Sequence, residues 1–249
     1  MPKLLVSAIM PVHNRPDFLA EAIESVLAQT CPVTELIVVD DGSTDGTREV
    51  LARYENRAVI LRRPHRGQSA ARNTGLERAT GAYIAYLDSD DLWAPTKVET
   101  MLRVLDKRPQ IGLVYSRTIE LLSDGTTVVA ESEPSTVRFV TSMHRAECLQ
   151  TVGLFDEELD VFEGFDMWLR MCDHYRVLGL PEPLYYHRHH GANTTLLRTE
   201  RMAAARSRIL LKRCRRAVEL GAKGARMPLG PVGALAPGQQ DVDLTSDRS

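Results

Sequence analysis

An acidic tripeptide, Asp88-Ser89-Asp90, directly follows an apolar run at residues 82–87 that is typical of a buried strand. Hard divalent cations such as Mg²⁺ and Mn²⁺ prefer carboxylate oxygens, and such a cation offsets the charge of a diphosphate while a bond to it breaks. Two carboxylates one residue apart at a strand end can both reach one metal–diphosphate unit. The tripeptide therefore predicts a metal site, although Asp is also common in turns and at helix starts.

A second acidic pair, Asp40-Asp41, follows the apolar residues 36–39. One interpretation is a tight turn with a helix cap at Ser43 or Thr44. The other is that Asp41 accepts a hydrogen bond from a nucleobase or a ribose. Two adjacent acids after a fully apolar strand cost free energy unless they have partners, which favours the binding role.

Both acidic segments lie in a stretch where short apolar runs alternate with helical patterns. Such alternation predicts an α/β fold with a mostly parallel, Rossmann-like central sheet flanked by helices. Ligands bind at the carboxyl ends of the strands in these sheets, so residues 11–14, 40–43 and 88–90 should share one rim. We expect strands at 4–10, 36–39, 58–61 and 82–87, with helices from Pro16 until Pro32, up to about Tyr54, and over 67–79.

The following residues extend the α/β pattern. Phe165, Trp168, Leu169 and Cys172 recur at helical spacing and predict the apolar face of a helix. Further elements are expected as a helix over 95–107, a strand over 111–115, a hairpin joining 118–122 to 126–130 through Asp124-Gly125, and a strand over 184–190.

The composition suits one compact domain, since 43% of the 249 residues are hydrophobic. A net charge of −2 gives no basic excess of the kind that binds nucleic acid. The four scattered cysteines, and the lack of a signal peptide or long apolar run, predict a cytoplasmic protein with reduced thiols. Residues 198–216 carry eight basic residues and one acid, so this segment either contacts the inner face of a membrane or forms a solvated helix.

Four ordered stretches together resemble glycosyltransferase family 2, whose members have the GT-A fold. The resemblance is clear over residues 4–115 and looser through 141–159, 162–170 and 185–195. It implies a domain over residues 1–195, in which 1–115 hold the nucleotide and 116–195 form a smaller acceptor-binding subregion. A basic helix over 196–220 and a disordered tail over 221–249 would follow. The four stretches read SAIMPVHNR, IVVDDGSTDGT, GQSAARNTGLERATG and YIAYLDSDDLW.

The resemblance also implies roles for single residues. His13 would stack on or hydrogen-bond the nucleobase, Asp41 would read it, and Asp90 would ligate Mg²⁺ or Mn²⁺. Arg72 and Asn73 would lie near the nucleotide, or else only pack the third helix. The nucleotide-binding set is Pro11, His13, Asn14, Asp41, Arg72, Asn73, Asp88 and Ser89.

The expected general base is the one clear departure from the family pattern. An inverting transferase needs a carboxylate that removes the proton of the acceptor hydroxyl. The family usually has Glu-Asp before the aromatic-Asp-x-Trp-Leu-Arg helix, but this chain has Glu163-Gly164. Glu163 is our first candidate and Asp166 the second, and loss of activity is the third interpretation. Glu163 could instead cap the helix, and Asp166 could simply pair with Arg170.

Three histidines near residue 190 and two tryptophans complete the candidates. His189 matches a late histidine of the family that completes the metal site or touches the diphosphate, whereas His187 and His190 carry less weight. Trp93 is expected to be exposed on the acceptor side, and Trp168 is expected to pack in the core.

The resemblance implies transfer of a sugar from a UDP- or dTDP-linked donor to a saccharide or lipid-linked acceptor, in cell-surface polysaccharide, lipopolysaccharide or glycoconjugate synthesis. A non-catalytic nucleotide-sugar-binding protein is the alternative, with Gly164 as its best support. A nucleotidyltransferase is disfavoured because PVHNRPDFL lacks a Gly-rich loop with Lys or Arg for a triphosphate.

Overall fold

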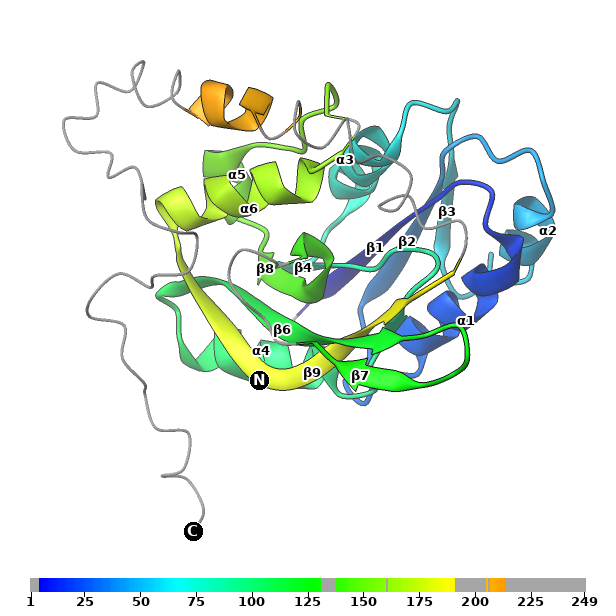
Figure 1. The fold of residues 1–249 in the computed structure, drawn as a ribbon, viewed down its shortest axis with the longest axis horizontal. Coiled ribbons are helices and arrows are strands. Elements are labelled where there is room, and N and C mark those ends of the chain that lie inside the picture. Colours follow the sequence, from blue (N-terminus) through cyan, green and yellow to red (C-terminus); the bar gives the residue numbers. More distant parts are fainter. Residues whose placement is uncertain (1–4, 131–137, 160, 191–204, 206, 214–249) are drawn as a thin grey trace, which may run out of the picture.

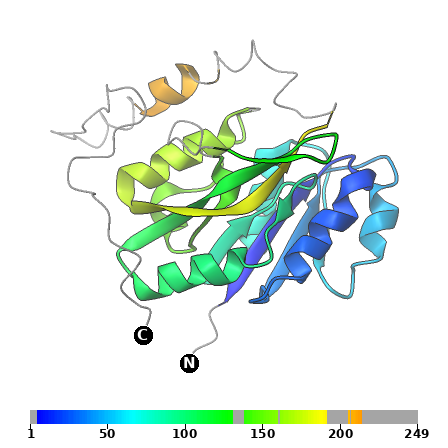
Figure 2. The ribbon, with the colours of Figure 1, turned by 60° about the horizontal axis from the view of Figure 1, so that its bottom comes forward.

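The computed structural model describes residues 5–130, 138–159, 161–190, 205 and 207–213. Their strands form a single mixed sheet in the order β3-β2-β1-β4-β8-β6-β9-β5 (Figure 1), and β7 pairs with the C-terminal end of β6. This is the expected α/β class, with helices on both sides of the sheet. Figure 2 shows α1 and α4 on one side and α6 on the other.

The first half of the sheet is parallel, as predicted. Its strands are β1 (Val6–Val12), β2 (Glu35–Asp40), β3 (Val59–Arg62) and β4 (Tyr83–Tyr86). Helices α1 (Pro16–Leu27), α2 (Thr47–Ala52) and α3 (Gln68–Arg78) connect them. Because Ile37 and Val39 of β2 pack against Ala71 of α3 while Leu36 and Val38 join the main core, both faces of β2 are buried.

The second half mixes both strand directions. Strand β8 (Ser142–Arg145) is antiparallel to β4 and β6 (Ile111–Leu121), and β6 is parallel to β9 (Arg176–Arg188). The predicted hairpin is confirmed, since β7 (Thr127–Val129) is antiparallel to β6. The other elements are β5 (Leu92–Trp93), α4 (Lys97–Lys107), the 3₁₀ turn η2 (Phe139–Thr141), α5 (Cys148–Val152) and α6 (Glu163–His174).

The predicted apolar face of α6 is partly wrong. Trp168 is buried, as expected, and its ring contacts that of Tyr115 edge-on at a centroid distance of 5.0 Å. Cys172 is exposed, however, and a polar pair, Asp166 and Arg170, is buried in the same helix. The i,i+4 ion pair of these two residues allows them to lie inside, which turns Cys172 to the outside.

The segment after residue 190 is described only in part. Residues 207–213 are helical, which agrees with the predicted helix over their length, and the predicted tail over 221–249 lies outside the described residues. Lys212 bonds Asp156 and Glu158, and Arg213 pairs with Asp173. No helix in the described parts of the chain is long and apolar enough to cross a membrane.

Candidate active site

A cleft of about 940 Å³ opens at the carboxyl ends of β1, β2 and β4, where the sequence predicted the site. The first half of the chain lines one side of it, with residues 11–15, 65–69, 71–72 and 88–91. The second half lines the other side, with residues 138–140, 157, 159 and 161–165. The predicted residues that line it are Pro11, His13, Asn14, Asp41, Arg72, Asp88, Ser89, Asp90 and Glu163.

Asp41 is held in place by four groups from one loop. Its carboxylate accepts the backbone N–H of Gly67 at 2.7 Å and that of Arg66 at 3.1 Å, and it lies 3.2 Å from Arg63 Nε and 2.8 Å from His65 Nδ1. These contacts provide the partners that a buried carboxylate needs. Asp41 therefore organises the wall formed by residues 63–67, and a nucleobase donor would have to share this carboxylate with them.

His13 and Asn14 form the adjacent part of the wall. The ring of His13 stacks on that of His65, with centroids 4.0 Å apart, and His13 Nδ1 lies 2.9 Å from the carbonyl oxygen of Asp41. Asn14 has a left-handed backbone with φ of 51°, and its side-chain oxygen accepts the Thr44 N–H at 2.9 Å. The flat pair of imidazoles is the feature here that suits a nucleobase, and sequence analysis missed His65.

The alternative interpretation, a helix cap at Ser43 or Thr44, is wrong. The next helix, α2, begins at Thr47, and the residue at its N-cap position is Gly46, which has no side chain to cap it. Instead, Asp40 accepts the Ser43 N–H at 2.8 Å and closes the turn. The two acids thus have different roles, because Asp40 fixes the turn while Asp41 faces the cleft.

Arg72 connects the two sides of the cleft. Its guanidinium donates to Asp88 Oδ1 at 2.8 Å and to Glu163 Oε1 at 2.6 Å, and Gln68 also donates to Asp88 at 2.9 Å. Arg72 is only 2% exposed, and burial opposes its charge, but the two carboxylates outweigh burial and raise its pKa. The candidate base and the acidic loop are therefore fixed by one cation on α3.

Asp90 faces the cleft with groups suited to a divalent cation. His190 Nε2 lies 3.0 Å from Asp90 Oδ2, and Arg15 Nε lies 3.4 Å from the same oxygen. Burial raises the pKa of Asp88, and the charges of Asp90 and Glu163 raise it further, whereas Arg72 lowers it. A cation beside Asp88 and Asp90 would relieve this repulsion, so these carboxylates and the His190 imidazole fit a bound metal.

Asp91 supports this loop from beneath and was missed from sequence. Tyr185 donates to its carboxylate at 2.7 Å, and the backbone N–H of Arg188 donates at 2.8 Å. Burial, together with the charges of Asp90 and Asp88, raises the pKa of Asp91 well above its ordinary value. Strand β9 thereby fixes the acidic loop from the far end of the sheet.

Four predicted residues lie outside the cleft lining, namely Asn73, Trp93, Asp166 and, as described below, His189. Asn73 is buried and hydrogen-bonds the backbone of Phe155 through both its amide atoms, so it packs α3 rather than facing a nucleotide. Asp166 is 2% exposed and paired with Arg170 at 2.7 Å, which leaves Glu163 as the carboxylate candidate for the base. The expected exposure of Trp93 is wrong, because this residue is only 3% exposed and its Nε1 donates to the Tyr86 carbonyl.

The start of α6 explains how the chain accommodates Gly164. Phe162, just before the helix, has a left-handed backbone with φ of 62°, which brings Glu163 to the cleft. A Cβ on Gly164 would come within 3.1 Å of Phe139 Cβ. Phe139 therefore packs closely against the position where the family usually has Asp.

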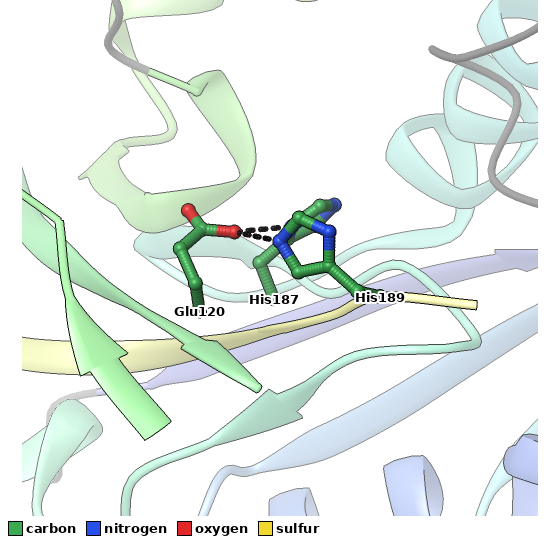
Figure 3. Close-up of side chains that lie close together, drawn as sticks. All are labelled: Glu120, His187 and His189. Carbon is green, nitrogen blue, oxygen red and sulfur yellow. Dashed lines mark hydrogen bonds and ion pairs between the residues drawn. The ribbon is translucent and has the colours of Figure 1, made fainter. Parts of the chain in front are cut away.

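His189 is not beside Asp90, contrary to the sequence prediction. His187 and His189 both contact Glu120, at 2.7 and 2.6 Å (Figure 3). His190 lies beside Asp90 instead. Side chains on a strand alternate between its two sides, and this alternation continues past the end of β9. A choice among three neighbouring histidines therefore needed the strand register, which the sequence did not supply.

Residues 7–152 match the profile of the family described as glycosyl transferase family 2. The chain belongs to this family. It is 29% identical over 209 residues to an uncharacterized glycosyltransferase, RP339, of Rickettsia prowazekii, a match that covers 77% of this chain and 66% of the relative. Over 110 residues it is 44% identical to the putative teichuronic acid biosynthesis glycosyltransferase TuaG of Bacillus subtilis, which covers 43% of this chain and 44% of TuaG. The chain thus spans two thirds or less of these relatives.

Solved structures share the fold. Staphylococcus aureus TarS 1–349 in complex with UDP-GlcNAc aligns with a TM-score of 0.63 at 22% identity, covering 76% of this chain and 60% of TarS 1–349. Mannosyltransferase PcManGT from Pyrobaculum calidifontis, in complex with GDP-Man and Mn²⁺, aligns with a TM-score of 0.64 at 21% identity, covering 84% and 64%. The predicted GT-A fold is therefore confirmed.

Proposed function

We propose that this protein transfers a sugar, with inversion, from a nucleoside diphosphate sugar to an acceptor hydroxyl. The observation that carries the proposal is the bridge through Arg72, which holds Glu163 and Asp88 in one cleft. An inverting transfer needs a base on the acceptor side and charge compensation on the leaving-group side. One buried cation that contacts both carboxylates fixes these two groups relative to each other.

The donor half is the wall formed by His13, Asn14, His65 and Asp41. Stacked imidazoles provide a flat face for a nucleobase, and the carbonyl and carboxylate of Asp41 provide hydrogen-bond acceptors. Pro11 and Ser89 complete the lining beside them. A UDP- or dTDP-sugar is the proposed donor, and the solved complex of TarS with UDP-GlcNAc supports this class.

Asp90 and His190 are the proposed ligands of Mg²⁺ or Mn²⁺. The cation, when bound, would offset the charge that builds on the diphosphate as the glycosidic bond breaks. Asp91 and the Tyr185 hydroxyl hold the loop so that Asp90 points into the cleft. Arg15, which also contacts Asp90, lies close enough to share the diphosphate charge.

Glu163 is the proposed general base. Its carboxylate lines the cleft with 14% of the side chain exposed, and Arg72 fixes its orientation. A carboxylate held in this way can accept the hydroxyl proton as the acceptor oxygen attacks the anomeric carbon. Phe139 lies so close to Gly164 that a side chain there would be crowded. Glu163, the residue before Gly164, is therefore proposed to perform the role that Asp usually has in the family.

The proposed acceptor is a saccharide or a lipid-linked saccharide of the cell surface, as the name of TuaG suggests for that relative. We also propose that the protein is cytoplasmic and that residues 198–216 contact the inner face of the membrane. Lys212 and Arg213 are already paired with acids of the domain, so the remaining basic residues of the segment would have to bind the membrane. Nucleic acid is not proposed as a partner.

The test measures nucleotide release and sugar transfer from a panel of UDP-, dTDP- and GDP-sugars, with Mn²⁺ and with chelator. We expect turnover of one donor that needs metal and is lost in Asp90→Asn. Glu163→Gln should retain donor binding but lose at least about 100-fold in kcat. Glu158→Gln, an exposed acid outside the cleft, is the matched control.

The alternative of a non-catalytic nucleotide-sugar-binding protein makes a different prediction. It expects metal-dependent donor binding with no release of nucleotide in the wild type, and the same binding in Glu163→Gln. Calorimetric binding and turnover, measured on the same preparation, separate the two functions.

A further inference from the structure

A second cluster of potential metal ligands lies on the far side of β9 from Asp90. Glu120 of β6 is the direct register partner of His187 on β9, and the two strands are parallel. The pairing continues one step further, because the His189 N–H donates to the Leu121 carbonyl at 2.8 Å. His187 and His189 are two residues apart, so both side chains lie on the side of Glu120.

The alternation along this strand separates the cluster from the Asp90 site. Arg188 and His190, the residues between and after the two histidines, contact Asp90 through its carbonyl oxygen and its carboxylate. His187 and His189 contact Glu120 instead. The strand thus presents one imidazole to the acidic loop and two imidazoles to Glu120, which makes two distinct sites.

The three ligand atoms converge on a small volume (Figure 3). His187 Nδ1 and His189 Nε2 lie 2.7 and 2.6 Å from the same oxygen, Glu120 Oε2, and the ligand atoms lie within 4.8 Å of one another. A four-coordinate Zn²⁺ holds its nitrogen and oxygen ligands at about 2.0–2.2 Å, and therefore roughly 3.3 Å from each other. Small side-chain rotations suffice to reach this geometry.

The surroundings suit a partly buried ion. The exposed fractions of the side chains are 12% for His187, 20% for Glu120 and 41% for His189, so the cluster is fixed on one side and open on the other. Arg138 lies 3.8 Å from Glu120 Oε1, the oxygen that the histidines do not contact, and can orient the carboxylate from outside. His187 also lines the cleft, so the open position is close to bound substrate.

We propose that Glu120, His187 and His189 bind a divalent transition-metal ion, with Zn²⁺ as the best match. Two imidazoles and one carboxylate are a ligand set for Zn²⁺ with the fourth position left for water or a substrate oxygen. Mg²⁺, which prefers oxygen ligands, does not match it. Binding of Zn²⁺ at this cluster requires neither the proposed sugar transfer nor a cation at Asp90.

The experiment titrates Zn²⁺ and, separately, Mg²⁺ into the chelator-treated full chain by calorimetry, in the Asp90→Asn background that removes the other site. We expect one Zn²⁺ per chain and no comparable Mg²⁺ binding. Glu120→Gln and His189→Gln should each weaken Zn²⁺ at least tenfold. His174→Gln, which changes an exposed histidine at the end of α6, outside the cluster, should leave the affinity unchanged.

A thermal-unfolding series checks that the variants are folded and gives a second readout. Zn²⁺ should raise the Tm of the Asp90→Asn chain, and this rise should disappear when Glu120→Gln or His189→Gln is added. The proposal is overturned if these variants bind Zn²⁺ within twofold of the parent. It is also overturned if Asp90→Asn alone abolishes Zn²⁺ binding, because the ion would then belong to the acidic loop.

Discussion

Arg72 shows how much a single buried cation can determine in this molecule. It contacts Asp88 of the β4 loop and Glu163 of α6, and its guanidinium also lies over the Phe155 ring at 5.3 Å. The charge of Glu163 is close enough to raise the pKa of Asp88, and both carboxylates raise the pKa of Arg72 by offsetting its charge. Removal of the guanidinium would leave two partly buried like charges that face each other.

We predict that Arg72→Met destabilises the fold by about 3–5 kcal/mol, because loss of one partner leaves buried charge uncompensated. Arg72→Lys should lose less, since it keeps the charge but cannot make two directed contacts. Urea denaturation gives the free energies of unfolding. Arg66→Met, which breaks an exposed pair with Glu157, is the control and should cost less than about 1 kcal/mol. Equal losses in Arg72→Met and Arg66→Met would show that the bridge contributes nothing special.

His144 gives a prediction about pH. It is fully buried on β8, its Nε2 lies 3.0 Å from the Tyr86 hydroxyl, and burial lowers its pKa to about 4. The unfolded chain binds a proton at this residue below about pH 6.5, whereas the folded chain does not. Stability should therefore fall as the pH drops from 6.5 towards 4, by on the order of 3 kcal/mol from this group.

The measurement is the free energy of unfolding of wild type and His144→Gln at several pH values between 4 and 8. His144→Gln should be less stable at pH 8, but its stability should fall less steeply on acidification. His174→Gln should keep the wild-type slope, because this histidine is exposed. Parallel curves for wild type and His144→Gln would contradict the assignment.

At the scale of elements, α3 carries Gln68 and Arg72, which both donate hydrogen bonds to Asp88 in the cleft, and the position of the helix depends on Gly75. A Cβ on Gly75 would lie 2.6 Å from Ile9 Cγ2 of β1, so an alanine would push the helix away from the sheet. We predict that Gly75→Ala costs roughly 1–3 kcal/mol and also lowers activity by displacing Arg72. Gly46→Ala, where the added atom meets only ordinary contacts, is the matched control.

A double-mutant cycle with Ile9→Ala tests the cause. If the Ile9 side chain is the obstacle, the double variant should be less destabilised than the sum of the single variants by at least about 0.5 kcal/mol. If the two losses of stability simply add, the destabilisation by Gly75→Ala has a cause other than the contact with Ile9.

The elements that sequence predicted best are those whose own residues determine them. The apolar runs of β1, β2 and β4 and the Asp124-Gly125 turn can be recognised from their own residues, without knowledge of their neighbours in the fold. Strand β8 was missed because SMHR has no apolar alternation and depends on its neighbours β4 and β6. Strand β9 is longer than expected because it continues through Pro181 and Pro183, where its pairing with β6 shifts register.

The site residues likewise differ in how far the sequence predicts them. Asp41, Asp88 and Asp90 could be placed because strand ends in a parallel sheet share one rim. The partners that determine their chemistry come from distant segments, such as Tyr185 for Asp91 and His190 for Asp90. Only the order of strands brings β9 to the acidic loop, and a single sequence contains no direct signal for that order.

At the scale of the whole molecule, carboxylates from both halves of the chain converge on the cleft. Asp88 and Asp90 come from the first half, and Glu163 comes from the second. Burial and mutual repulsion raise the pKa values of Asp88 and Asp91, so a metal-free cleft resists another anion. A nucleoside diphosphate should therefore bind well only together with a divalent cation, and the pair should tie the two halves together.

We predict that UDP and Mn²⁺ together raise the Tm far more than the sum of their separate effects. At a hundredfold excess over Kd, a ligand contributes about 2.7 kcal/mol, which for a chain of this size corresponds to roughly 5–10 °C. Differential scanning fluorimetry with UDP, Mn²⁺, or both gives the comparison. Asp90→Asn should abolish the joint shift, whereas Asp106→Asn, an exposed acid on α4, should preserve it. A UDP shift that is the same with Mn²⁺ and with chelator would mean that the cleft binds the diphosphate through its arginines alone, such as Arg15, Arg66 and Arg72. The carboxylates would then need another role.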